Sequence, residues 1–149
     1  RQMCIRDRNC TRKFRCDGVM YMIKVLLADD QELIRESLGF VLGAQGDITV
    51  VGMAKNGREA IELVRSEKPD VVLMDIRMPV MDGLEATRRI RSVSADVPII
   101  AMSAYSSGSE IESARNAGCN EFLVKPLSQY SLHRALNAAL VEFKGKGKS

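Results

Sequence analysis

The sequence predicts an α/β domain with a doubly wound, five-stranded parallel sheet. From Met22 onward, five short apolar runs alternate with five amphipathic stretches. Strands that alternate with helices in this way pair in parallel, because each crossover helix returns the chain to the same edge of the sheet. The composition agrees, since 149 residues with 46% hydrophobic and 28% charged side chains are enough for one domain with its own core.

The first unit of the alternation is a strand at residues 23–28 followed by a helix. The strand is a mostly apolar run that ends at Asp29 and Asp30, as expected for a strand buried on both faces. In the next stretch, apolar residues recur every three or four positions, which is typical of an amphipathic helix. They are Leu33, Ile34, Leu38, Val41 and Leu42. Gly43 and Gly46 predict the end of this helix.

The second and third units follow the same pattern. A strand at 48–53 precedes a helix that begins at Asn56-Gly57 and ends at Lys68-Pro69. The third strand, 71–74, leads directly into Asp75, and a helix at 83–92 follows the loop around Pro79. The last two units are predicted as a strand at 99–102, a short helix at 109–116, a strand at 121–124 and a helix at 129–143.

The positive charge of the chain lies at its two ends. The formal charge is +3, but residues 1–21 carry +4, residues 142–149 carry +2, and residues 22–141 carry −3. A basic face for reading DNA is therefore not expected on the body of the domain, and we expect no direct contact with nucleic acid. Apolar runs are all of strand length, so no membrane span is expected either.

Residues 1–21 are predicted to be a disordered basic leader. They show no hydrophobic periodicity and no apolar core of a signal peptide, and the opening residues resemble translated sequencing-adapter sequence, so we expect them not to be native. Cys4, Cys10 and Cys16 lack the paired spacing of a zinc site. Only Cys119 lies in the body, which favours a reducing, cytoplasmic location. Residues 144–149 are predicted to be a flexible Lys/Gly tail or the start of a linker.

Polar residues follow four of the predicted strands. Asp29 and Asp30 follow the first, Asp75 the third, Ser103 the fourth, and Lys125 the fifth. In a doubly wound sheet, ligands bind beyond the carboxyl ends of the strands, so these side chains should converge at one edge. Taken singly, Asp30, Asp75 and Ser103 are explained equally well as caps of the helices that follow them.

Together, the convergent side chains indicate phosphoryl chemistry. Three carboxylates held close together repel one another and are tolerated mainly beside a cation. Oxygen ligands with a transferring phosphate are typical of Mg²⁺. A lysine, a hydroxyl and a divalent metal around one carboxylate are the groups needed to place a phosphoryl group on that carboxylate.

Four sequence elements match one known family. They are Asp29-Asp30, the run at 72–83 that contains Asp75, the triplet at 102–104, and the segment from Phe122 to Pro126. From about residue 22 to residue 143 the chain resembles the receiver domain of bacterial two-component response regulators. The resemblance covers about four fifths of the chain and implies a flavodoxin-like (βα)5 receiver fold.

The resemblance implies a role for each matching residue. Asp75 would be the phosphoacceptor, and Mg²⁺ would be held by Asp29, Asp30, Asp75 and the backbone carbonyl of Arg77. Ser103 and Lys125 would contact the phosphoryl group, and Pro126 would follow a cis peptide bond. Phe122 would be the switch aromatic that turns inward when Ser103 moves. Arg77 and Tyr105 resemble positions that tune hydrolysis, and because both are bulky we expect slow autodephosphorylation.

The implied partners are proteins. A sensor histidine kinase or a phosphotransfer protein of a phosphorelay would supply the phosphoryl group. A downstream protein would bind the face made by the helix at 109–116, the strand at 121–124 and the helix at 129–143. A phosphorylation-dependent homodimer is a further partner that the resemblance allows. The domain would be a signalling module and not an enzyme, apart from its own phosphotransfer and autodephosphorylation.

Other functions stay open at this point. Phosphotransferases of the haloacid dehalogenase type also use an Asp nucleophile, Mg²⁺ and Lys, but their nucleophile follows the first strand. A flavodoxin-like nucleotide binder would need a glycine-rich phosphate loop after the first strand, which this sequence lacks. A receiver could stand alone, precede a DNA-binding domain, or come from a hybrid kinase.

Overall fold

The computed structural model describes residues 14–16, 19–21, 23–44, 48–93, 96–104 and 107–147. Five strands alternate with five helices, which confirms the predicted α/β fold. The elements are β3 (Ile23–Ala28), α1 (Glu32–Gly43), β4 (Ile48–Ala54), α2 (Gly57–Glu67), β5 (Val71–Asp75), α3 (Gly83–Val93), β6 (Ile99–Ser103), α4 (Gly108–Ala117), β7 (Glu121–Val124) and α5 (Gln129–Gly147). Among these described residues, no helix has the length and apolar character required to cross a membrane.

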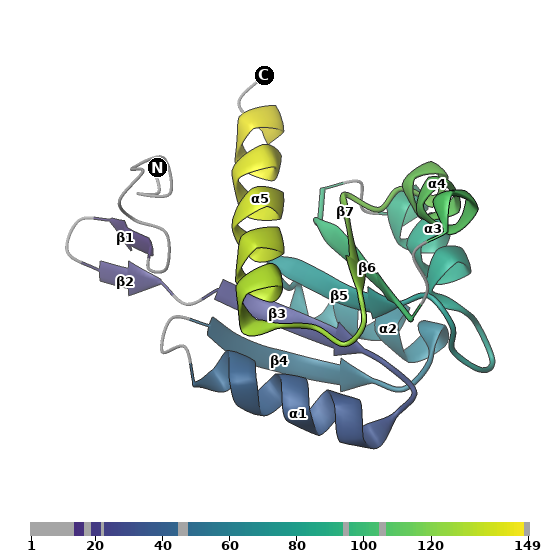
Figure 1. Cartoon of the computed structure of the whole chain (residues 1–149). Helices are drawn as coiled ribbons and strands as arrows, with labels where there is room; N and C mark the ends of the chain where they lie inside the picture. The colour runs from purple at the N-terminus through teal and green to yellow at the C-terminus, as the bar shows by residue number, and fades with distance from the viewer. Residues whose placement is uncertain are drawn as a thin grey trace.

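The five strands form one parallel sheet in the order β4-β3-β5-β6-β7 (Figure 1). This is the flavodoxin-like order. The chain runs outward from β3 in one direction to β4 and in the other to β5, so the topological switch point lies between β3 and β5. The carboxyl ends of these two central strands are therefore where a functional site is expected.

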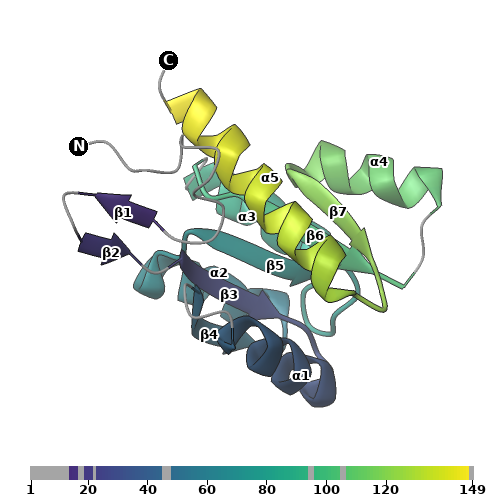
Figure 2. The same ribbon diagram turned by 60° about the vertical axis from the view of Figure 1, so that its left-hand side comes forward.

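Helices cover both faces of the sheet (Figure 2). Val25 and Leu27 of β3 point to the face that α1 and α5 cover, where Leu42 and Leu136 are also buried. Leu26 and the other alternate residues point to the opposite face and pack against α2 and α3. Residues of a buried strand alternate between two cores, which explains why residues 25–28 of β3 and residues 71–74 of β5 are all apolar.

The last helix is longer than predicted. α5 continues to Gly147, whereas the sequence predicted its end at Phe143, so residues 144–147 are helical and not a flexible tail. Lysine is a good helix former, and a glycine within a helix costs only about 1 kcal/mol relative to alanine, so the alternating Lys and Gly residues do not by themselves end α5.

The leader is partly structured. β1 (Phe14–Cys16) and β2 (Val19–Tyr21) pair antiparallel in a separate two-stranded sheet, so the prediction of disorder was wrong for these six residues. Their sequences contain aromatic and β-branched residues, and the Asp17-Gly18 dipeptide between them is typical of hairpin turns. The rest of residues 1–21 lies outside the described residues, as do Lys148 and Ser149.

Candidate functional site

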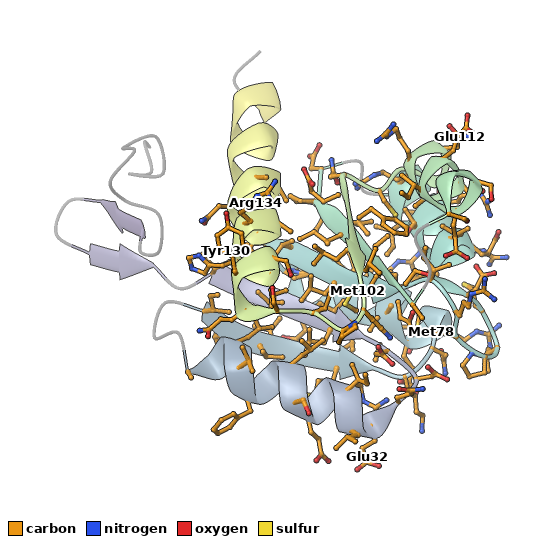
Figure 3. All side chains as sticks on the ribbon, in the orientation of Figure 1. Glu32, Met78, Met102, Glu112, Tyr130 and Arg134 are labelled. Carbon is orange, nitrogen blue, oxygen red and sulfur yellow. The ribbon has the colours of Figure 1, made fainter. Side chains whose placement is uncertain are left out.

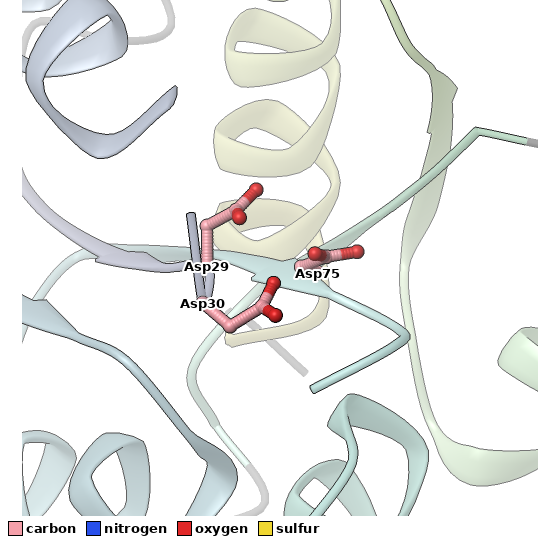
Figure 4. A group of neighbouring side chains, drawn as sticks. All are labelled: Asp29, Asp30 and Asp75. Atoms are coloured by element: carbon pink, nitrogen blue, oxygen red, sulfur yellow. The ribbon is translucent and has the colours of Figure 1, made fainter. Parts of the chain in front are cut away.

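Three aspartates meet at the carboxyl ends of the two central strands (Figure 4). Each offers a carboxylate oxygen that lies within 4.8 Å of the other two. Asp29 and Asp75 are buried, with 1% and 5% of their surface exposed, whereas Asp30 is exposed to solvent. The cluster therefore has two anchored carboxylates and one that faces outward.

Strand pairing accounts for this convergence. Ala28 of β3 lies opposite Met74 of β5 in the parallel register, so Asp29 and Asp75 each come next in the chain. The Asp29 backbone N–H donates to the Ala54 carbonyl at 3.0 Å, and the Asp29 side chain accepts from Gln31 N–H at 2.9 Å. Hydrogen bonds of both its main chain and its side chain thus hold Asp29 in place.

Lys125 reaches this cluster from the end of β7. Its Nζ lies 2.6 Å from Asp29 Oδ2 and 3.1 Å from Asp75 Oδ2. Burial alone would lower the pKa of Lys125, but its hydrogen bond to Asp29 and the charge of Asp75 outweigh burial and hold the pKa above its usual value. The ammonium is therefore charged. The Lys125–Pro126 peptide bond is cis, the isomer expected at this position.

The carboxyl of Asp75 has a raised pKa. Burial, followed by the charge of Asp29, raises the pKa of Asp75 to about 6, and Lys125 lowers it only in part. Three carboxylates and the Lys125 ammonium give the site a formal net charge of −2. A divalent cation that takes oxygen ligands matches both this charge and these donors.

The loop after β5 lies against Asp75. The backbone N–H of Arg77 donates to Asp75 Oδ1 at 3.4 Å, so the Arg77 backbone is beside the carboxylates. Gly83, the first residue of α3, packs so closely on β5 that a Cβ there would clash with the Asp75 carbonyl oxygen. Its N–H also donates to the Ile76 carbonyl at 2.8 Å. Glycine at this position lets α3 begin directly behind the acidic cluster.

Ser103 is buried at the end of β6, and its hydroxyl points to a residue that the sequence did not indicate. Ser103 Oγ donates to Glu110 Oε1 at 2.5 Å. The other oxygen of Glu110 accepts from Arg77 Nη2 at 2.7 Å. These two hydrogen bonds hold the pKa of Glu110 below its usual value. Ser107-x-x-Glu110 has the spacing of a capping box, but that pattern could not reveal the contact with Ser103.

The remaining predicted residues lie around these groups. Phe122 of β7 is half-buried against Ile76, Ala101 and Ala114, between the sheet and α4. Tyr105 lies outside the described residues. An open depression of about 800 Å³ adjoins the acidic cluster, and its lining includes Asp30, Arg77, Pro79 and Glu110. The side of the site with the exposed carboxylate is therefore open to solvent.

Comparison with known proteins adds independent findings. Residues 25–137 match the family model of the response regulator receiver domain. The chain is 40% identical over 121 residues to the transcriptional regulatory protein PdtaR of Mycobacterium tuberculosis, covering 81% of this chain and 58% of PdtaR. It is 43% identical over 113 residues to the two-component response regulator ORR41 of Oryza sativa, covering 74% of this chain and 89% of ORR41.

Solved structures agree. The signal receiver domain of the response regulator NarL from Mycobacterium tuberculosis superposes with a TM-score of 0.76 and 32% identity, over 84% of this chain and 98% of that domain. The chain spans about half the length of several bacterial regulators that it matches, from 50% to 58%. The matched segment, the strand order and the acidic site at the switch point agree, and the chain belongs to the response regulator receiver domain family.

Proposed function

We propose that Asp75 accepts a phosphoryl group from the phosphohistidine of a histidine kinase or phosphotransfer protein. A carboxylate oxygen of Asp75 attacks phosphorus, the P–N bond breaks, and its electron pair stays on the histidine nitrogen of the donor. The observation that carries this proposal is the position of Asp75, at the switch point with Asp29, Asp30 and Lys125 around its carboxylate.

Mg²⁺ is the proposed cofactor. The candidate ligands are Asp29, Asp30, Asp75 and the backbone carbonyl of Arg77, and the net charge of −2 supports a divalent ion. When bound, the ion would supply positive charge where the phosphoryl oxygens gather.

The other residues have roles that follow from their chemistry. Lys125, already charged and within hydrogen-bond distance of Asp75, would pair with a phosphoryl oxygen. Ser103 would donate its hydroxyl to the same group. Phe122 would turn toward the space that Ser103 leaves, and the changed face of α4, β7 and α5 would bind the downstream partner.

The setting of the domain is also proposed. A protein with this function is expected in the cytoplasm, where it meets its kinase and its target. The domain itself is a signalling module without substrate turnover, and a phosphorylation-dependent homodimer is one candidate output. Which effector follows or binds the receiver depends on the whole protein, since the matched segment is only about half of the bacterial regulators, 52% and 50% of their lengths.

Incubation with acetyl phosphate and Mg²⁺ tests the proposal. We expect at most one base-labile phosphate per chain, and none when Mg²⁺ is chelated. Continued release of phosphate from p-nitrophenyl phosphate over many turnovers would instead indicate a phosphatase of the haloacid dehalogenase type.

A further inference from the structure

Glu110 joins the phosphorylation site to the first turn of α4. Its two carboxylate oxygens accept from different elements, one from Ser103 at the end of β6 and the other from Arg77 in the loop after β5. Only 14% of the Glu110 side chain is exposed. Both hydrogen bonds are charge-assisted, which makes them stronger than neutral ones.

The hydroxyl of Ser103 has a single proton to donate. In the unphosphorylated structure the Ser103 hydroxyl donates to Glu110, at 2.5 Å. The proposed function requires the same proton for a phosphoryl oxygen on Asp75. Glu110 and the phosphoryl group therefore compete for Ser103, and Ser103 must leave Glu110 before it can stabilise the phosphorylated state.

Arg77 is subject to the same competition. Its guanidinium pairs with Glu110, while its backbone N–H donates to Asp75. A phosphoryl group on Asp75 would bring negative charge close to Arg77, and the guanidinium pairs well with phosphate oxygens. Phosphorylation thus weakens both contacts that hold Glu110.

A released Glu110 has a second position available. It is the third residue of α4, and Ser107 is the N-cap, with the Glu110 backbone N–H donating to Ser107 Oγ at 3.3 Å. In a capping box with this spacing, the glutamate carboxylate accepts from the backbone N–H of the N-cap residue. The same side chain can therefore stabilise two arrangements of the α4 N-terminus.

We propose that Glu110 is a latch, a positioning residue that holds Ser103 and Arg77 in the unphosphorylated state and whose release on phosphorylation frees the first turn of α4. The latch rests on the proposed function, because it acts on the same Ser103 that would bind the phosphoryl group. It lowers the population of the phosphoryl-binding conformation and so weakens the apparent affinity for any phosphoryl mimic.

The experiment measures binding of beryllium fluoride, a phosphoryl mimic, in the presence of Mg²⁺. Glu110→Gln removes the charge that Arg77 and Ser103 recognise, and we expect it to bind the mimic about tenfold more tightly than wild type, because one charge-assisted hydrogen bond changes an equilibrium by this factor or more. Glu112→Gln is the matched control, since Glu112 is exposed on the same helix and points away from the site (Figure 3). We expect less than a twofold change for it.

Measuring the effect of Glu110→Gln in Ser103→Ala protein distinguishes a latch that acts through Ser103 from a general effect of removing one negative charge. If Glu110 acts through Ser103, Glu110→Gln should give little gain when Ser103 is already alanine. Amide NMR signals of residues 108–111 should also move part of the way toward their mimic-bound positions in free Glu110→Gln. A gain below twofold, or an equal gain in the Ser103→Ala background, overturns the latch. Failure of wild type to bind the mimic would instead count against the proposed function.

Discussion

The ammonium of Lys125 lies 3.1 Å from the carboxylate of Asp75, although 50 residues separate them in the sequence. It lies closer still to Asp29, at 2.6 Å. Lys125 therefore already compensates part of the negative charge before any metal or phosphoryl group is bound.

Replacing Lys125 with methionine tests this compensation. Asp29 is almost fully buried, and Lys125→Met would leave its charge without that partner. We expect the free energy of unfolding in the absence of Mg²⁺ to fall by about 3 kcal/mol, measured by urea denaturation. Lys55→Met, at an exposed position, is the control. Equal stability of Lys125→Met and wild type would show that the contact with Asp29 contributes nothing.

The raised pKa of Asp75 predicts how stability depends on pH. The pKa of Asp75 in the folded protein is about 6, above its usual value of 3.8, so the folded state binds more protons than the unfolded state between pH 3.8 and pH 6. Ionised Asp75 therefore destabilises the fold fully above about pH 6, and the penalty disappears below about pH 3.8.

Asp75→Asn removes this penalty. With divalent ions chelated, we expect the variant to be more stable than wild type by about 2 to 3 kcal/mol at pH 7.5, and the gain to vanish as the pH falls toward 4. Chemical denaturation at a series of pH values measures the difference. A gain that stays constant with pH would contradict a raised pKa.

Binding of Mg²⁺ should stabilise the protein. An ion that binds only the folded state adds RT ln(1 + [Mg²⁺]/Kd), which is about 2.7 kcal/mol at one hundred times Kd. We expect Tm to rise with Mg²⁺ concentration in wild type and the rise to be lost in Asp30→Asn. Asp96→Asn provides the control, since Asp96 precedes β6 at the opposite edge of the sheet and is exposed. Loss of the rise in both variants would argue against the acidic cluster as the ligand set.

The bulk of Arg77 and Tyr105 predicts a long-lived phosphorylated state. The Arg77 side chain is 65% exposed beside the acidic cluster, where it would hinder the approach of water to the acyl phosphate. We expect the half-life of the phosphorylated protein to shorten several-fold when both residues are changed to alanine. Decay of phosphorylated protein after removal of the phosphodonor measures it, with Arg88→Ala as an exposed control. An unchanged half-life would reject this role.

Much of the fold follows from local patterns. The end of β3 at Ala28 and the start of α2 at Gly57 were both predicted, because apolar periodicity and cap residues are local signals. The convergence of Asp29, Asp75 and Lys125 was also predictable, since a parallel sheet brings strand ends to one edge. α5 is longer than predicted because a glycine does not always end a helix. The leader hairpin was not predicted because its two strands of three residues are too short to show a clear periodicity.

The contact between Glu110 and Ser103 could not be predicted. It depends on how α4 lies against the end of β6, and that arrangement comes from packing of Ala114 and Phe122 and not from sequence spacing. The sequence also did not predict that the carboxylate nearest to Lys125 would be that of Asp29. Such details depend on side-chain positions that tertiary packing determines.

The location of the phosphate tests the central claim most directly. Wild type, Asp75→Asn and Asp82→Asn are incubated with acetyl phosphate and Mg²⁺, and the modified residue is identified by tandem mass spectrometry after borohydride reduction. Asp82 is an exposed aspartate in the neighbouring loop, so its variant matches the change in charge. The account predicts one phosphate on Asp75 in wild type and in Asp82→Asn, and none in Asp75→Asn. An equal yield of phosphate in Asp75→Asn would contradict it.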